Sequence, residues 1–245
     1  LGAYYVKEKN ENDTNFKIFP DVEVSYDAYG EGFIIYGGVG GNLQQITYQE
    51  QSLINPYISP TQKFRPTHTT FDLFGGIKGN FLWGLSYNLK ANYAQIKNLP
   101  MFMANQKLIL TEYQPYQYDN TYSLVYDNAT HFGFLAELGG KISEKFTFGI
   151  GARADSFSPE KQENAWNIPV FSSNISASYK VLPNWNIGTK IFFVGERTDV
   201  KHTLATLSKE KVSLEGFFDI NFFTDYTLAK RWTIFANFNN VLGKN

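Results

Sequence analysis

The sequence has 245 residues, a formal net charge of −1 and no cysteine. This balance lacks the basic field that nucleic-acid binding requires, and it excludes disulfides and cysteine-ligated metals. Aromatic residues make up 17% of the chain and charged residues only 18%, against about 25% charged residues in globular proteins. No apolar run approaches the roughly 20 residues of a membrane-spanning helix. The chain opens as LGAYYV, already a strand-like pattern, so we expect a fragment of a longer protein.

Apolar and polar residues alternate along most of the chain. The stretch 81–93, FLWGLSYNLKANY, alternates without a fault, which predicts one long strand because successive side chains of a strand point to opposite faces. The same alternation recurs in residues 22–28, 71–78, 132–139, 146–155, 171–181, 185–193 and 214–226. No segment has a sustained helical period, and we predict an all-β chain of about a dozen strands.

Two kinds of connection take turns between these strands. Turn residues predict tight connections at residues 79–80, 143–145, 183–184 and 229–231. Long polar or mixed connections are expected at about residues 47–70, 99–121, 158–167 and 199–211. This order predicts an antiparallel up-and-down meander with short turns at one end and long loops at the other.

The apolar face of such a sheet covers either a soluble core or lipid. Four features favour lipid over a soluble β-sandwich: strands longer than the usual 5–6 residues, polar faces rich in Gly, Ser and Asn, the asymmetry of the connections, and aromatic residues near strand ends. Those aromatic residues are Tyr87, Tyr93, Trp185, Tyr226 and Trp232. Because backbone groups in hydrocarbon must be paired internally, we predict a transmembrane antiparallel up-and-down β-barrel.

The alternation then predicts which charged residues face the lumen. Both signs are present, so pairing across the lumen is expected for some of these residues, and the others are interpreted as solvated wall residues. The candidates are Glu23, Asp27, Lys78, Lys90, Glu137, Lys141, Arg153, Asp155, Lys180, Lys190, Glu196, Glu215, Asp219 and Asp225.

Four stretches go beyond the general pattern of a barrel. They are NPYISPTQKFRPTHTTFDLFGGIKGN (55–80), AWNIPVF (165–171), FFVGERTD (192–199) and FANFNNVLGKN (235–245). They resemble the barrel of TonB-dependent outer-membrane receptors of Gram-negative bacteria, and the last resembles the penultimate barrel strand and its turn. The resemblance implies that residues 1–245 are a single barrel domain, incomplete at both ends, in the bacterial outer membrane. No plug domain or TonB box, the parts that couple energy in this family, is visible in the sequence.

The resemblance implies uptake of a solute across the outer membrane, in contact with lipid and with a TonB-type energy-coupling protein or other envelope proteins. Two alternatives stay open: a barrel subunit of a larger secretion or assembly complex that transports nothing, and a passive porin. Residues 111–127 contain Tyr113, Tyr116, Tyr118 and Tyr122 in an expected external loop. They are candidates either for solute recognition or for the upper aromatic girdle.

The sequence predicts no enzyme, cofactor or metal site. Residues 149–154 match the dinucleotide fingerprint GxGxxA, but no helical pattern follows it. The glycine run at 37–41 lacks the lysine of a phosphate loop and instead predicts a bulge, a bend or a close backbone approach. His68, His131 and His202 lack metal-ligand spacing and are expected to be solvated in or beside loops. The one candidate for a lipase-like site is His131, next to Asn128 and Thr130.

Overall fold

The computed structural model describes residues 2–9, 14–30, 32–81, 84–106, 121–203, 208–229 and 231–243. These residues form thirteen strands and one short helix, α1 (Tyr48–Ile54). The first strands are β1 (Gly2–Lys9), β2 (Thr14–Asp27), β3 (Ile34–Gln44), β4 (Thr67–Phe81), β5 (Leu85–Ala104), β6 (Tyr122–Lys141) and β7 (Phe146–Pro159). They are followed by β8 (Phe171–Leu182), β9 (Trp185–Val194), β10 (Arg197–Thr203), β11 (Ser208–Leu214), β12 (Phe217–Leu228) and β13 (Trp232–Phe238).

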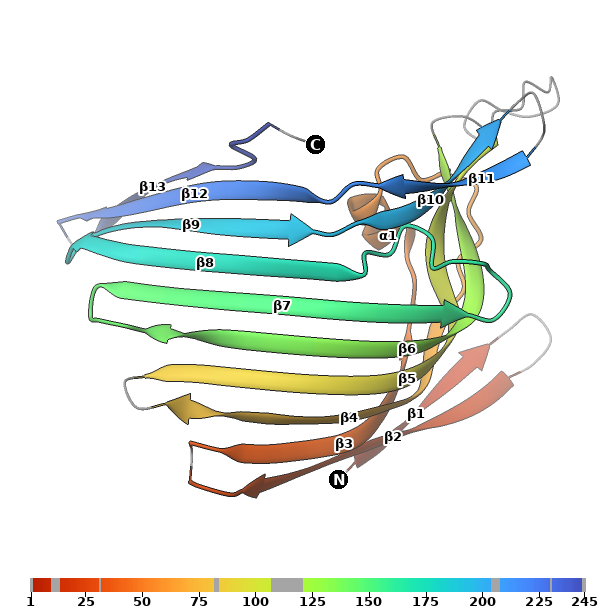
Figure 1. Ribbon diagram of the computed structural model, residues 1–245, viewed down its shortest axis with the longest axis horizontal. Coiled ribbons are helices and arrows are strands. Elements are labelled where there is room, and N and C mark those ends of the chain that lie inside the picture. The colour runs from red at the N-terminus through yellow and green to blue at the C-terminus, as the bar shows by residue number, and fades with distance from the viewer. Residues whose placement is uncertain are drawn as a thin grey trace.

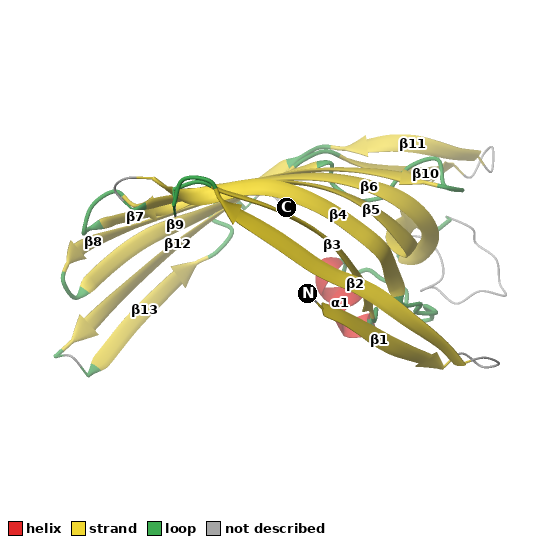
Figure 2. Cartoon of the chain, turned by 90° about the horizontal axis from the view of Figure 1, so that it is seen from below, coloured by secondary structure: helices red, strands yellow, loops and turns green. Residues whose placement is uncertain are grey.

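Eleven strands form one antiparallel sheet in the order β1-β2-β3-β4-β5-β6-β7-β8-β9-β12-β13 (Figure 1). Strands β10 and β11 form a separate hairpin inserted between β9 and β12. The sheet arches, with its middle strands at the top of the view and its edge strands lower on either side (Figure 2). In the described part of the chain, β1 and β13 each pair with one neighbour, so the sheet is not closed. The predicted all-β meander is confirmed.

The hairpin between β4 and β5 corrects two predictions. Residues 81–93 are not one strand, because β4 ends at Phe81 and β5 begins at Leu85, with Gly84 in the left-handed region at φ 77°. Gly79 and Asn80, predicted to be the turn, lie inside β4, where Gly79 pairs with Tyr87. The apolar residues fall on odd positions both before and after this turn, so the alternation does not reveal it.

Helix α1 lies in the connection between β3 and β4, where the sequence pattern predicts no helix. Thr47 and Glu50 form a capping box, in which the backbone N–H of Glu50 donates to the Thr47 side chain and the Thr47 N–H donates to the Glu50 carboxylate. A helix of seven residues makes too few turns to produce a sustained period in the sequence. In the described residues, no helix has the length and apolar character needed to cross a membrane.

Buried apolar side chains gather at the end of the sheet that carries the long connections. There the extended hairpin of β5 and β6 has both faces covered. Leu99, Met101 and Ala129 pack with Trp166 and Val200 on one face, whereas Phe102 and Leu124 pack with Ile46 and Ile58 on the other. Met101 is fully buried. We call these two clusters together the loop-end core.

The β10–β11 hairpin replaces most of the loop predicted at residues 199–211. It is tied to the end of β5, because His202 Nε2 lies 2.9 Å from the Ala104 carbonyl oxygen and the Ala104 N–H donates to Asp199. The segment after β7 joins the same assembly, since Asn167 Nδ2 donates to the Phe102 carbonyl at 3.0 Å. The described parts of the long connections therefore fold into a packed structure at one end of the sheet (Figure 1).

Candidate functional site

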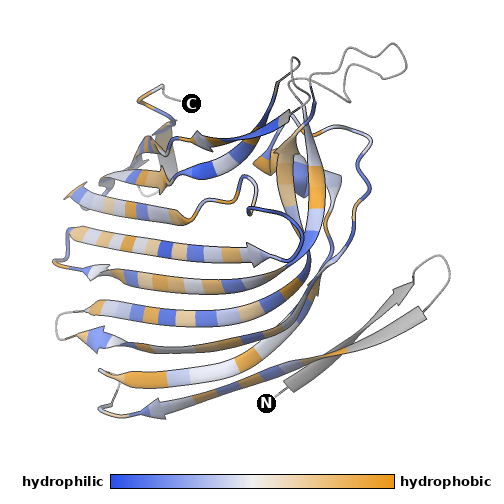
Figure 3. Cartoon of the chain, turned by 45° about the vertical axis from the view of Figure 1, so that its right-hand side comes forward, coloured by the Kyte–Doolittle hydropathy of each residue, from blue (hydrophilic) through white to orange (hydrophobic). Residues whose placement is uncertain are grey.

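Strand register sorts the side chains of the large sheet into two faces. Lys78 on β4 is opposite Asn88, Asn88 is opposite Glu137, Glu137 is opposite Gly151, and Gly151 is opposite Asn174. Directly opposed residues share a face, so this row crosses five strands on one face, which we call the polar face. Hydrophilic and hydrophobic residues alternate along the strands in Figure 3.

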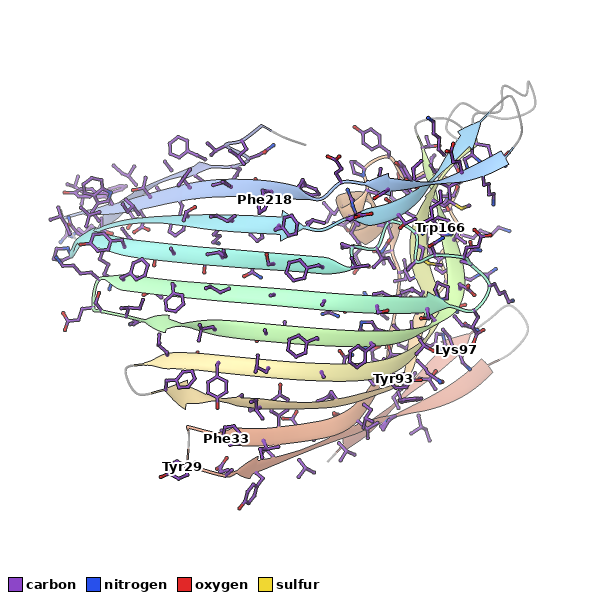
Figure 4. The ribbon with its side chains drawn as sticks, in the orientation of Figure 1. Tyr29, Phe33, Tyr93, Lys97, Trp166 and Phe218 are labelled. Carbon is purple, nitrogen blue, oxygen red and sulfur yellow. The ribbon has the colours of Figure 1, made fainter. Side chains whose placement is uncertain are left out.

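The opposite face, which we call the apolar face, exposes large hydrophobic side chains. Phe132, in the middle of β6, is 55% exposed, and Phe218, near the start of β12, is 53% exposed. Other exposed residues on this face are Leu73, Leu89, Tyr93, Phe134, Ile150, Ile175, Ile187 and Phe222; Tyr93 and Phe218 are labelled in Figure 4. A continuous exposed apolar surface of this kind marks contact with another apolar phase or partner.

The charged residues predicted to face a lumen share the polar face. Glu196 lies in the link between β9 and β10 and Glu215 in the link between β11 and β12, outside the strands. All the others lie in strands, and the register puts them on one face: Glu23, Asp27, Lys78, Lys90, Glu137, Lys141, Arg153, Asp155, Lys180, Lys190, Asp219 and Asp225. That this face lines a lumen stays a prediction.

Polar side chains on this face are linked across the strands. Tyr36 Oη donates to Asn88 Oδ1 at 2.6 Å, and Asn88 Nδ2 donates to Glu137 Oε2 at 2.9 Å. This chain of hydrogen bonds spans β3, β5 and β6. The result is a wall whose polar groups orient one another rather than pointing separately into solvent.

A second group surrounds Asp155. His131 Nε2 lies 2.7 Å from Asp155 Oδ1, and Arg153 Nε donates to Asp155 Oδ2 at 2.6 Å. The His131 ring stacks on Phe157 with 4.3 Å between centroids, and its side chain is only 5% exposed. Asp155 therefore lies between two cationic or donor groups at the loop end of the polar face.

The histidine predictions are wrong in part. His131 and His68 are buried in β6 and β4 rather than solvated in loops. Sequence spacing does not reveal the burial of His131, because its partner Asp155 is 24 residues away in the chain. His131 faces Asp155 on the polar face, away from the outer face that a lipase-like site would need.

An open hollow of about 840 Å³ lies on the polar face over strands β3 to β8. Gly139, Gly149 and Gly151 form part of its floor, and Lys78, Asn88, Glu137, Asn174 and Ser176 contribute its polar lining. The amides, hydroxyl and charges make it a surface for a hydrated or hydrogen-bonding ligand. Its extent over six strands could not be predicted from any one segment of the sequence.

The tyrosine candidates are only partly visible. Tyr113, Tyr116 and Tyr118 lie outside the described residues. Tyr122 is the first residue of β6, and it packs partly buried against the cluster that contains Ile58. Its backbone N–H donates to the Tyr57 carbonyl at 2.9 Å. Its role in recognition stays a prediction.

The glycine motifs belong to strands. Residues 149–154 lie within β7. The run at 37–41 lies in β3, where the register shifts between Gly40 and Asn42, as the prediction of a bulge requires. In the part of the chain that the structure describes, no three His, Cys, Asp or Glu side chains are grouped as metal ligands.

A scan against protein-family models and a sequence comparison with curated proteins find no match. Solved structures share the fold. The ferripyoverdine receptor of the outer membrane of Pseudomonas aeruginosa matches with a TM-score of 0.64 and 20% identity, over 95% of this chain and 30% of that chain. The FpvAI–pyocin S2 complex matches with 0.64 and 17%, over 95% and 29%. The siderophore receptor PiuA from Acinetobacter baumannii matches with 0.60 and 14%, over 95% and 32%.

The fold is that of the barrel of TonB-dependent outer-membrane receptors, and the predicted resemblance and fold class are confirmed. The chain spans about 30% of the length of the ferripyoverdine receptor. The predicted location, the bacterial outer membrane, agrees with this fold. Solved structures that share it include receptors and a copper transporter, and one is the complex of FpvAI with pyocin S2.

Proposed function

We propose that this chain forms part of the wall of an outer-membrane barrel that takes up a solute. The polar face lines the lumen, and the apolar face contacts lipid. The observation that carries the proposal is the division of one sheet between a hydrogen-bonded polar face and an exposed apolar face. Lipid accepts such a sheet because antiparallel pairing satisfies the backbone within the strands and the apolar band removes the need for a protein core.

The solute is proposed from the solved structures that share the fold. One is a receptor bound to ferripyoverdine and another is a siderophore receptor. Iron–siderophore complexes are therefore the first solutes to test. The proposed partner is a TonB-type energy-coupling protein, because the receptors with this barrel belong to the TonB-dependent class.

The test is uptake by living cells. A strain that makes the full-length protein and a matched deletion strain are grown with limiting iron and offered a panel of siderophores loaded with radioactive iron. We expect uptake of at least one chelate only in the first strain, and loss of that uptake when a protonophore collapses the proton gradient.

Two other outcomes contradict the proposal. Free permeation of uncharged sugars through vesicles that contain the purified protein would indicate a passive porin. Stoichiometric co-purification with other envelope proteins, with no uptake of any chelate, would indicate a structural subunit.

A further inference from the structure

Three lysines on the polar face lie over aromatic rings. The distances from Nζ to the ring centroid are 4.7 Å for Lys78 over Tyr36, 4.2 Å for Lys90 over Phe74 and 6.0 Å for Lys190 over Phe223. An ammonium group within about 6 Å of a ring centroid is attracted to the negative face of the ring. Each lysine is therefore held in a defined position on the wall.

Each of these rings has a glycine opposite it on the neighbouring strand. Tyr36 pairs with Gly76, Phe74 with Gly38, and Phe223 with Gly188. A Cβ at Gly76 would come within 2.7 Å of Tyr36 Oη, and one at Gly38 within 2.8 Å of Phe74 Cζ. Only glycine leaves room for the ring to lie over the next strand. The same arrangement of glycine, ring and lysine thus occurs three times.

Carboxylates are near two of these lysines, yet neither lysine pairs with one. Glu137 is a diagonal neighbour of Lys90 across β5 and β6, but it accepts a hydrogen bond from Asn88. Lys190 is opposite Asn221 on β12. Its ammonium group lies over Phe223, on one side of Asn221, whereas Asp219 lies on the other side. Within the described residues neither Lys90 nor Lys190 forms an ion pair.

Lys78 has a weak carboxylate partner. Its Nζ lies 3.9 Å from Glu23 Oε1, with both side chains about half exposed. Such an exposed pair is weak, so an incoming anion can compete with it. Lys78 and Lys90 are diagonal neighbours across β4 and β5, at a Cα separation of roughly 7–8 Å. Two ammonium groups at this spacing can contact one oxyanion.

We propose that Lys78 and Lys90 bind a carboxylate or phosphate group of an anionic solute, at the edge of the hollow described above. The inference rests on the proposed function and names the charge class of the solute. Asn88, Asn174 and Ser176 in the hollow supply hydrogen bonds for the rest of the molecule. Lys190 provides a third cation on β9, beyond the hollow.

Binding to the full-length protein in detergent tests the inference. The probes are ferric citrate and inorganic pyrophosphate, which are anionic, and raffinose, which is uncharged, each followed by titration calorimetry. We expect both anions to bind, and K78Q and K90Q each to weaken that binding about tenfold, the effect of losing one charge-assisted hydrogen bond. K145Q changes a lysine in the turn before β7 and should leave binding unchanged.

A second variant tests the role of the ring. Phe74→Leu should weaken anion binding because it releases Lys90 toward Glu137, whereas Phe74→Tyr should retain it. Heat-modifiable migration on gels checks that each variant folds. Binding of neither anion to the unaltered protein, or equal binding by K90Q and K145Q, would overturn the inference.

The two proposals fail separately. If cells import an uncharged or cationic chelate and the anions do not bind, the lysine site is wrong and the uptake function stands. If the anions bind through Lys78 and Lys90 but cells import nothing, the site stands and the uptake function is wrong.

Discussion

Replacing Gly76 by alanine tests whether the polar face is packed as the structure indicates. Gly76 lies in β4 between Tyr36 on β3 and Lys90 on β5. Its added methyl group would fall against the carbonyl oxygen of Leu89, which is backbone, and within 2.7 Å of Tyr36 Oη. The strand cannot yield at Leu89 without disturbing its pairing, so the tyrosine and both strands must shift.

The magnitude follows from opposing terms. Overpacking costs about 1–3 kcal/mol, and displacing Tyr36 from Asn88 costs about 0.5–1.5 kcal/mol more. Alanine also restricts the unfolded chain more than glycine does, which favours the folded state by about 0.4–1 kcal/mol. We therefore expect Gly76→Ala to lower the free energy of unfolding by about 1–3 kcal/mol.

The neighbouring glycine supplies the control. A Cβ at Gly75 has its nearest heavy atom, the Tyr36 carbonyl oxygen, at 3.8 Å, which is ordinary contact. Gly75→Ala should be neutral or slightly stabilising. The assay is urea unfolding of the full-length protein in phospholipid vesicles, followed by tryptophan fluorescence. If Gly76→Ala is as stable as Gly75→Ala, the close packing of Tyr36 over β4 is incorrect.

Three further predictions address the apolar face, the loop-end core and the buried carboxylate. Ile220→Arg should cost about 2–4 kcal/mol in the same unfolding assay, because Ile220 lies on the apolar face, and Asn174→Arg on the polar face should cost far less; equal costs would contradict the orientation. Trp166→Ala should destabilise the packing of the loop-end core by about 3–5 kcal/mol. Trypsin should then cleave after Lys161 faster, while heat-modifiable migration of the barrel is unchanged. An unchanged cleavage rate would argue against packed loops. Asp155→Asn should cost about 1–3 kcal/mol, because it weakens two hydrogen bonds to a nearly buried group, and unfolding free energies equal to those of the unaltered protein would show that the group is not structurally important.

The division into two faces could be predicted because a strand has a period of two. The alternation predicts that charged residues far apart in the sequence, such as Lys78, Glu137 and Asp219, share one face, and the register puts them there. This works because each antiparallel partner preserves the face of the residue it opposes. A single error in the number of residues in a bulge would have reversed the assignment.

Turns and local helix were harder to predict. The β4–β5 turn is hidden because apolar residues occupy odd positions on both sides of Gly84. Helix α1 is specified by the capping pair Thr47 and Glu50 rather than by a period. Both features depend on a few residues, whereas the alternation averages over many.

The site depends on contacts that sequence patterns do not contain. The stacking of His131 on Phe157, and of Lys90 on Phe74, joins residues from different strands whose register is set by the whole meander. The alternation predicts the lysines to be wall residues, but nothing in the sequence indicates that an aromatic ring lies beside each one.

The loop-end core has a consequence for the order of folding. Neighbouring strands of the meander are close in sequence, so their pairing can form early. The hydrogen bond between Ala104 and Asp199 joins residues 95 positions apart, and the one between Phe102 and Asn167 joins residues 65 positions apart. Contacts with such long separation form slowly, because a long loop must close first. The contact between Met101 and Val200 therefore forms only when β10 docks on β5. We expect closure of the loop-end core to be a late kinetic phase that follows assembly of the sheet.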